Sequence, residues 1–163
     1  VREFIHVSSA VPKLYKGQIG YIKLRVFGDK TRQEFSECLQ KLQRAGVEAL
    51  VVDLRNNGGG YVQAAIDVCS FFLPRGKTVT TVVEPRTGKS SRYNSYQSYN
   101  INIPTVVLIN KYSASASEIM AAALRDYKVA LLVGEKSFGK ASVQSIFPLS
   151  DGGAIKYTIA HYN

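Results

Sequence analysis

Two short, almost continuously apolar segments do most to constrain the fold of this chain. Residues 49–54 (Ala-Leu-Val-Val-Asp-Leu) and 105–109 (Thr-Val-Val-Leu-Ile) lack the strict alternation that marks a strand with one face in solvent. Runs of this kind are typical of strands buried on both faces, as in a parallel sheet. Because helical patterns alternate with them, the sequence predicts an α/β domain: a layered core with a parallel-type central sheet flanked by helices.

Apolar residues recur at helical spacing in segments that begin near residues 31, 62 and 113. Thr31 with Glu34, and Ser115 with Glu118, have the spacing of a capping box, in which each side chain bonds a free backbone N–H at the start of a helix. Gly46 is a natural stop for the first helix. We expect helices over about 31–46, 62–72 and 113–127.

The other patterned segments favour strands and hairpins. Residues 85–100 are polar and rich in Ser, Tyr and Asn, which indicates an exposed excursion or a hairpin. Asp151-Gly152-Gly153 is a turn signal between two further strands. Besides the two apolar segments, strands are expected over residues 4–11, 19–27, 78–83, 129–133, 142–147 and 154–162.

Length and composition set broad limits. The 163 residues fit one domain with a sizeable core, and no apolar run approaches the roughly 18 to 20 residues that span a bilayer. The chain lacks an initiator Met and opens on a strand-like pattern, so we interpret it as a fragment of a longer protein. The net charge is +9, but Lys and Arg are scattered and no nucleic-acid motif accompanies them, so we expect a solvated basic surface and no nucleic-acid partner.

Cysteines and histidines offer no metal or disulfide pattern. Cys38 and Cys69 fall on the apolar faces of expected helices and do not form a Cys-x-x-Cys pair, so we expect buried free thiols. His6 and His161 stand alone, without the spacing of a metal site. We therefore expect neither a metal nor a cofactor.

A serine-rich segment joins a buried strand to a helix at residues 113–119 (Ser-Ala-Ser-Ala-Ser-Glu-Ile). Such a turn can expose a serine beside outward-pointing backbone N–H groups, and the helix N-terminus carries positive partial charge that stabilises an oxyanion. Taken alone, the same segment is also an ordinary helix cap with small residues for tight packing. It makes Ser115 a candidate nucleophile.

Two more segments could complete such a site. Residues 56–60 (Asn-Asn-Gly-Gly-Gly) follow a buried strand, and their backbone N–H groups could form an oxyanion hole or a flexible turn; the Gly-Lys-Ser/Thr ending of a phosphate loop is absent. In residues 135–144, Lys140 lies among small and apolar residues, and desolvation favours the neutral form that a lysine base requires. Strand spacing puts Gln144 on the same face, where it could steady the amine. A solvated surface lysine is the alternative.

Taken in order, these segments resemble the signature of the carboxy-terminal processing, or tail-specific, proteases. The resemblance extends over about residues 20–162, and the serine motif followed by Phe-Gly-Lys is its most specific part. It implies a fold like that of the crotonases and the Clp proteases, and a serine endopeptidase that acts through a Ser-Lys dyad and an acyl-enzyme. Its substrates would be proteins or peptides, cleaved near their C-terminal tails.

The resemblance assigns a role to each matching residue. Ser115, the middle serine of Ser-Ala-Ser-Ala-Ser, matches the nucleophile, and Lys140, after Phe-Gly, matches the general base. Gln144 matches the glutamine that supports the lysine. The backbone N–H groups of Gly60 and Ala116 match the oxyanion hole. No metal or cofactor belongs to this mechanism.

The resemblance also implies parts that lie outside this sequence. Family members usually carry a PDZ domain before the core, so residues 1–163 are expected to be the catalytic core, and 1–17 its lead-in strand. Membrane association would come only through segments outside the sequence. An extracytoplasmic compartment (periplasm, cell envelope or organelle lumen) is expected. Gly58 stands where many members have proline.

Three other functions compete with this interpretation. One is a non-catalytic ligand- or peptide-binding module on the same fold. Another is a crotonase-like acyl-CoA enzyme, which shares the oxyanion-hole logic but needs no Ser-Lys pair. The last is a Ser-His-Asp hydrolase that uses His6 or His161 with Asp53 or Asp126.

Overall fold

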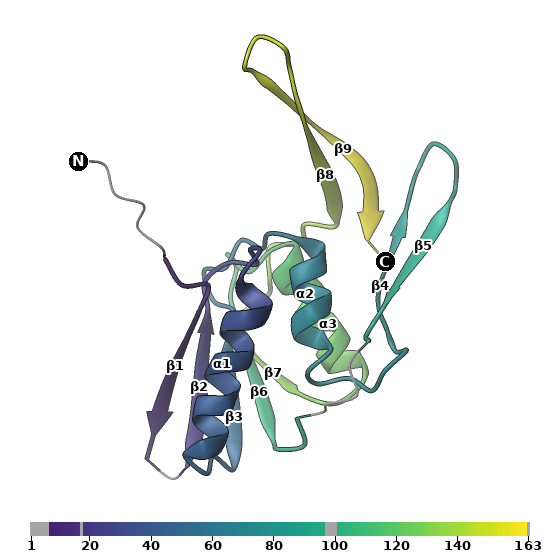
Figure 1. Ribbon diagram of the computed structural model, residues 1–163. Coiled ribbons are helices and arrows are strands. Elements are labelled where there is room, and N and C mark those ends of the chain that lie inside the picture. The colour runs from purple at the N-terminus through teal and green to yellow at the C-terminus, as the bar shows by residue number, and fades with distance from the viewer. Residues whose placement is uncertain (1–6, 17, 97–100, 163) are drawn as a thin grey trace, which may run out of the picture.

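The computed structural model describes residues 7–16, 18–96 and 101–162. Its strands form two sheets, with the orders β1-β2-β3-β6-β7 and β5-β4-β9-β8 (Figure 1). No helix in these ranges is both long and apolar enough to cross a membrane. The elements are β1 (Ala10–Tyr15), β2 (Ile19–Leu24), α1 (Thr31–Arg44), β3 (Ala49–Asp53), α2 (Val62–Cys69), β4 (Thr78–Val83), β5 (Ser90–Asn94), β6 (Thr105–Ile109), α3 (Ala116–Asp126), β7 (Leu131–Gly134), β8 (Ser142–Pro148) and β9 (Ala154–Tyr162).

The larger sheet holds the two apolar segments at its centre. β2, β3, β6 and β7 run parallel, with Ile22 opposite Val52 and Val52 opposite Val107. β1 joins one edge antiparallel to β2. The parallel sheet predicted from residues 49–54 and 105–109 is therefore confirmed.

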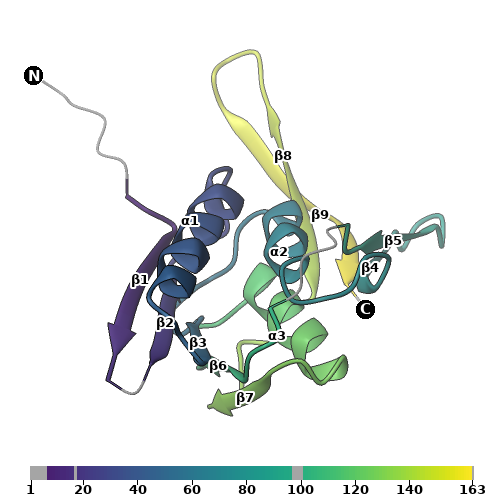
Figure 2. The same cartoon turned by 60° about the horizontal axis from the view of Figure 1, so that its bottom comes forward.

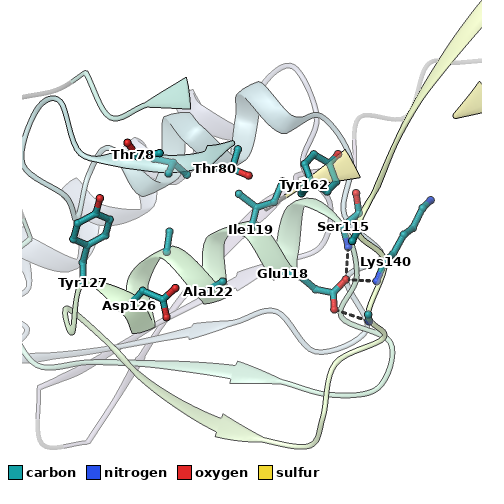
Figure 3. Close-up of a pocket in the computed structure, with 14 residues that line it drawn as sticks. Thr78, Thr80, Ser115, Glu118, Ile119, Ala122, Asp126, Tyr127, Lys140 and Tyr162 are labelled. Carbon is teal, nitrogen blue, oxygen red and sulfur yellow. Dashed lines mark hydrogen bonds between the residues drawn. The ribbon is translucent and has the colours of Figure 1, made fainter. Parts of the chain in front are cut away.

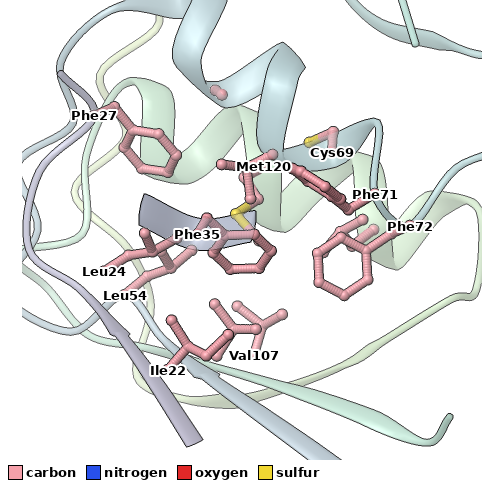
Figure 4. Close-up of a cluster of buried hydrophobic side chains, with 14 of the residues drawn as sticks. Ile22, Leu24, Phe27, Phe35, Leu54, Cys69, Phe71, Phe72, Val107 and Met120 are labelled. Atoms are coloured by element: carbon pink, nitrogen blue, oxygen red, sulfur yellow. The ribbon is translucent and has the colours of Figure 1, made fainter. Parts of the chain in front are cut away.

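The main core lies between this sheet and the helices, which gather on one of its faces (Figures 1 and 2). Ile22, Val52 and Val107 point to that face and are completely buried. Figure 4 shows Phe35 over Ile22 and Val107, and the Phe35 ring packs against Phe71. Burying a side chain of this size stabilises the fold by about 2 kcal/mol. Most side chains on the opposite face of β3 and β6 are only partly buried, so the helices cover one face of the sheet rather than both.

The start of the chain differs from the prediction. The first described strand covers Ala10–Tyr15 rather than residues 4–11, of which 4–6 lie outside the described residues. The capping box predicted for α1 is wrong. Thr31 Oγ1 accepts the Gly28 N–H at 2.8 Å, while the Glu34 carboxylate accepts the Ser9 N–H at 2.6 Å. Glu34 therefore holds the approach to β1 instead of capping its own helix. Gly46, with a φ of 71°, does end α1.

The two cysteines are buried free thiols, as predicted. Burial, with help from nearby Glu34 and Glu37, raises the pKa of Cys38 to about 11, and burial alone raises the pKa of Cys69 further. Both thiols therefore stay protonated and unreactive at neutral pH.

The smaller sheet consists of two hairpins, β4–β5 and β8–β9. The hairpin predicted over residues 142–162 is confirmed. Of the two alternatives for residues 85–100 the hairpin is present, with residues 97–100 outside the described part of the chain. The two hairpins join through a short antiparallel pairing, Val82 with Tyr162 and Val83 with His161. Beyond this contact, β8 and β9 extend from the body as a two-stranded ribbon (Figures 1 and 2). The β4–β9 junction brings the end of β9 next to α3.

Candidate active site

Ser115 lies at the tight turn from β6 into α3. Its backbone has φ 55° and ψ −117°, a region that L-residues rarely occupy, and strain of this kind is concentrated at functional sites. The serines on either side fix the turn from within. Ser113 Oγ donates to the Leu54 carbonyl at 2.8 Å, and Ser117 Oγ donates to the Asn57 carbonyl at 2.9 Å. The turn is thereby held by the end of β3 and the glycine loop that follows it.

The glycine loop packs directly against this turn. Asn57, completely buried, donates through Nδ2 to the Leu24 carbonyl at 3.0 Å and accepts the Gly59 N–H on Oδ1 at 2.9 Å. A Cβ placed on Gly59 would lie 2.7 Å from the Ala114 carbonyl oxygen and 2.9 Å from Ser115 Cβ, and the φ of Gly59 is 100°. Glycine is required at residue 59 on both counts.

Two backbone N–H groups next to this junction, those of Gly60 and Ala116, differ from their neighbours in their hydrogen bonding. Among the described residues, no group accepts a hydrogen bond from the N–H of Gly60 or of Ala116. Ala116 is also the first residue of α3, where the helix dipole favours negative charge. These are the two N–H groups expected from the sequence to form an oxyanion hole. Gly60 is exposed, whereas Ala116 is completely buried.

A buried carboxylate anchors the start of the glycine loop. Asp53, only 1% exposed, accepts hydrogen bonds from the Tyr21 hydroxyl at 2.7 Å and from Arg55 Nε and Nη2 at 3.0 and 2.8 Å. Lys23 Nζ lies 3.2 Å away. Burial would raise the pKa of Asp53, but the hydrogen bonds from Arg55 and Tyr21 and the charge of Lys23 hold it well below its ordinary value. Burial and the bond to Asp53 raise the pKa of Tyr21 to about 12.

Glu118 connects the serine turn to the segment that carries Lys140. One of its carboxylate oxygens accepts the Ser115 N–H at 2.9 Å and the Lys140 N–H at 2.8 Å; the other accepts Ser137 Oγ at 2.7 Å and the Gly139 N–H at 2.6 Å (Figure 3). Burial would raise the pKa of Glu118, but these four hydrogen bonds outweigh it and hold the pKa below its ordinary value. The reach of Glu118 back to Ser115 was predicted from capping-box spacing, whereas its bonds to residues 137–140 were not.

Lys140 borders the same site but does not bond to Ser115. Its Nζ donates to Gln144 Oε1 at 3.2 Å, a contact that the strand spacing predicts, and its side chain extends outward past Ser115 (Figure 3). The apolar surroundings expected for Lys140 do not form, because Phe138 is 67% exposed and Ala141 is exposed as well. Side chains of flanking residues in an extended loop point to different sides, so apolar neighbours in sequence do not desolvate the amine.

A cavity of about 450 Å³ opens beside Ser115 and runs along α3 (Figure 3). Tyr162, at the end of β9, borders its near end; burial raises the pKa of its hydroxyl, while hydrogen bonding with the Ser115 side chain acts in the opposite direction. Sequence reasoning placed Tyr162 in a strand but gave no sign that it reaches Ser115. The lining residues are Thr78, Val79, Thr80, Ser115, Glu118, Ile119, Ala122, Ala123, Asp126, Tyr127, Gly139, Lys140, Ala141 and Tyr162.

The structure does not support a Ser-His-Asp triad on the described residues. Asp53 is held by Arg55 and Tyr21, and the side chain of His161 is exposed on β9 and does not line the cavity beside Ser115. His6 lies outside the described residues.

Comparison with known proteins gives consistent matches. The model of peptidase family S41 matches residues 18–163. The carboxyl-terminal-processing protease of Synechocystis sp. is 43% identical over 144 residues, which cover 88% of this chain and 33% of that protein. The carboxy-terminal processing protease CtpA of Bacillus subtilis is 34% identical over 161 residues, or 99% of this chain and 34% of the relative. The chain thus spans about a third of the length of these curated relatives.

Solved structures agree with the sequence matches. The photosystem II D1 C-terminal processing protease superposes with a TM-score of 0.83 at 31% identity, over 99% of this chain and 45% of that one. This likeness confirms the expected α/β fold, with its parallel sheet and added hairpins. Since the family model covers nearly the whole sequence and these relatives exceed 30% identity, the chain belongs to peptidase family S41.

Proposed function

We propose that this chain is the catalytic core of a serine endopeptidase in which Ser115 is the nucleophile and Lys140 the general base. The observation that carries the proposal is the convergence at one turn of a strained serine, two unpartnered N–H groups and the lysine segment, which Glu118 ties to the turn. A nucleophile, a base and oxyanion donors within one site are the parts that acyl transfer needs.

In the first half of the reaction, neutral Lys140 takes the proton of the Ser115 hydroxyl while Ser115 Oγ attacks the peptide carbonyl carbon. The N–H groups of Gly60 and Ala116 stabilise the oxyanion of the tetrahedral intermediate. The protonated Lys140 then gives its proton to the leaving amine as the C–N bond breaks, which leaves an ester between Ser115 and the acyl part of the substrate.

In the second half, Lys140 takes a proton from water, and the resulting hydroxide attacks the ester carbonyl. The ester bond breaks, and Ser115 recovers its proton from Lys140. For both halves the lysine side chain rotates from its contact with Gln144 toward Ser115, while its backbone stays fixed by the Glu118 carboxylate. Gln144 holds the amine when the side chain is turned away from Ser115.

The substrate class follows from the relatives. They are named for processing carboxyl termini, and several, including a peptidase of Arabidopsis thaliana, are chloroplastic. We extend to this chain the cleavage of proteins near their C-terminal tails, in an extracytoplasmic or lumenal compartment. A PDZ domain in the full-length protein, followed by residues 1–17, would deliver the tail to the core formed by residues 1–163.

The deciding experiment is cleavage of an unfolded protein with an apolar C-terminus by the full-length parent, compared with its Ser115→Ala and Lys140→Ala variants. Both variants are expected to lose activity by at least about a thousandfold. Lys136→Ala is the matched control, because Lys136 is an exposed lysine on the same segment. Labelling of Ser115 by a fluorophosphonate would show that this hydroxyl is reactive. Full activity in Ser115→Ala would exclude Ser115 as the nucleophile. No cleavage and no labelling by the folded parent would instead favour the non-catalytic binding module.

A further inference from the structure

Asn110, which follows the last residue of β6, connects two turns that lie side by side at one edge of the larger sheet. β3 and β6 are parallel neighbours, so the glycine loop after β3 and the serine turn after β6 begin at the same edge. Asn110 Oδ1 accepts the Asn56 N–H at 2.9 Å, and Asn110 Nδ2 donates to Asn56 Oδ1 at 2.9 Å. The same Oδ1 accepts the Tyr112 N–H at 3.2 Å. One amide side chain thus bonds both the start of the glycine loop and the start of the serine turn.

The backbone conformation of Asn56 is supported by this contact. Its φ of 60° lies in the left-handed region, which L-residues rarely adopt and which Asn tolerates better than most. The pair of bonds to Asn110 uses both the N–H and the side-chain oxygen of Asn56. Asn110 therefore stabilises the conformation in which the chain enters the glycine loop.

The contact between Asn56 and Asn110 lies at the surface, unlike the other side-chain bonds across this junction. The hydroxyls of Ser113 and Ser117 donate to backbone carbonyls on either side of Asn56, and both of these bonds are buried. Asn56 is exposed and Asn110 is partly buried, so water can replace their two bonds when one side chain is removed. Loss of the contact should therefore leave the fold intact and loosen the start of the glycine loop.

The two turns carry the proposed oxyanion donors, the N–H groups of Gly60 and Ala116. A Cβ on Gly59 would lie 2.9 Å from the Ala116 nitrogen, so the two backbone segments are in direct contact. The far end of the glycine loop is bonded to Phe27, whose N–H donates to the Gly59 carbonyl at 3.0 Å and whose carbonyl accepts the Tyr61 N–H at 2.7 Å. With that end fixed, a shift at the start of the loop changes the separation of the two donors. Stabilisation of an oxyanion requires donors within about 2.7 to 3.1 Å of it.

We propose that Asn110 is a positioning residue for the reaction. By holding Asn56 it sets the separation of the Gly60 and Ala116 N–H groups, and so it acts on the tetrahedral intermediate rather than on substrate binding. The proposal rests on the proposed endopeptidase function and adds the residue that aligns its oxyanion donors. Asn110 takes no part in the proton transfers, because its side chain bonds Asn56 and the serine turn.

The test measures kcat and KM of the full-length parent on a quenched fluorescent peptide that the wild type cleaves. In Asn110→Ala, kcat should fall by roughly tenfold or more, since the oxyanion donors are displaced but not removed. KM should change by less than about twofold, because the lost interaction is made only in the transition state. Asn102→Ala is the matched control, because Asn102 is an exposed asparagine ahead of β6; its kcat should equal that of the wild type.

Variants of Asn56 separate this role from a general effect on folding. Asn56→Gly suits the φ of 60° but removes the oxygen that accepts the Asn110 Nδ2–H, so kcat should fall. Asn56→Asp keeps an oxygen acceptor there and should retain kcat within about threefold of the wild type. Added to Asn110→Ala, the Asn56→Gly change should have no further effect, because both changes remove the same contact.

An unchanged kcat in folded Asn110→Ala, a higher KM at constant kcat, or additive losses in the double variant would overturn the positioning role. If Asn110→Ala does not fold, the comparison of Asn56→Gly with Asn56→Asp decides, and equal kcat values for these two would contradict the proposal. Undiminished cleavage by Ser115→Ala would instead overturn the endopeptidase function, so the two failures are distinguishable.

Discussion

The two halves of the proposed dyad come from regions with opposite physical character. Ser115 lies in a buried turn that is bonded to β3, the glycine loop and α3. Lys140 precedes a ribbon whose outer part exposes large apolar side chains, among them Phe147, Ile155 and Tyr157. A two-stranded ribbon is marginally stable by itself, whereas the sheet and helices share one continuous core. The nucleophile is thus fixed by the fold, and the base is fixed chiefly by Glu118.

The largest loss of stability is expected from Asp53→Asn, which changes a buried side chain at the end of β3. The change removes the charge that pairs with Arg55 and Lys23 at a buried position and leaves the hydrogen bonds of the loop mismatched. Arg55 and Lys23 keep contact with solvent, so the expected loss is that of the hydrogen bonds to the buried carboxylate, about 3 kcal/mol. The free energy of unfolding in urea should fall by this amount. Asp29→Asn, a change at an exposed residue between β2 and α1, is the comparison and should alter stability by less than about 0.5 kcal/mol.

Gly59→Ala should have the next largest effect and lower the free energy of unfolding by about 2 kcal/mol. The change puts a Cβ at a φ of 100° and within 2.9 Å of Ser115 Cβ. Displacement of the turn should also remove hydrolysis. Gly58→Ala is the matched control, since a Cβ there meets nothing within 4 Å. Thermal unfolding and peptide hydrolysis would be measured on both variants. Equal melting temperatures would show that the glycine loop is not pressed against Ser115.

Glu118→Gln tests the connection between the two regions. An amide in place of the carboxylate points a donor at two of the four groups that now donate to it, and loss of charge-assisted bonds costs about 2 kcal/mol. Hydrogen exchange should accelerate at the Gly139 and Lys140 amides more than in the core of β3. Glu135→Gln, at an exposed site on the same segment, should have no such effect.

The stability difference between wild type and Glu118→Gln should also depend on pH. The folded-state pKa of Glu118 lies below its ordinary value, so the stability it contributes is present above that value and is lost as the pH falls through the folded-state pKa. The stability difference between wild type and Glu118→Gln should therefore shrink on acidification below about pH 4.3. A difference that stays constant between pH 7 and pH 3 would exclude this role for the carboxylate.

The smallest effect is expected in the ribbon. Phe147 stacks on Tyr157 with ring centroids 4.9 Å apart, yet both rings are almost half exposed. Phe147→Ala should lower the stability of the β8–β9 ribbon against local opening by about 1 kcal/mol or less, which is the contribution of an aromatic pair. Hydrogen exchange should rise in β8 and β9, while the global unfolding midpoint stays within error. A large drop in the midpoint would mean that the ribbon and the core unfold as one unit.

Sequence patterns predicted the parallel sheet better than the hydrogen bonds by which Glu118 joins the Ser115 turn to the Lys140 segment. The apolar runs at 49–54 and 105–109 specify the parallel sheet. The predicted contact between Lys140 and Gln144 also forms, although Lys140 precedes β8 and the register shifts between Val143 and Gln144. Both signals are local. Glu118, by contrast, bonds residues 19 to 22 positions away, and Glu34 leaves its own helix for Ser9, 25 positions earlier. Capping-box spacing considers only hydrogen-bond partners that are close in sequence. The Glu34 carboxylate instead accepts a backbone N–H from a distant residue.

The backbone of Ser115 has a consequence for how such chains evolve. A φ of 55° favours glycine over every L-residue, so the fold itself would gain stability from losing the serine. Selection for folding alone would favour glycine at this turn, and the proposed role of Ser115 as nucleophile accounts for a hydroxyl there. A descendant of this fold that keeps its glycine loop but carries glycine at the turn would be a more stable protein without the proposed nucleophile.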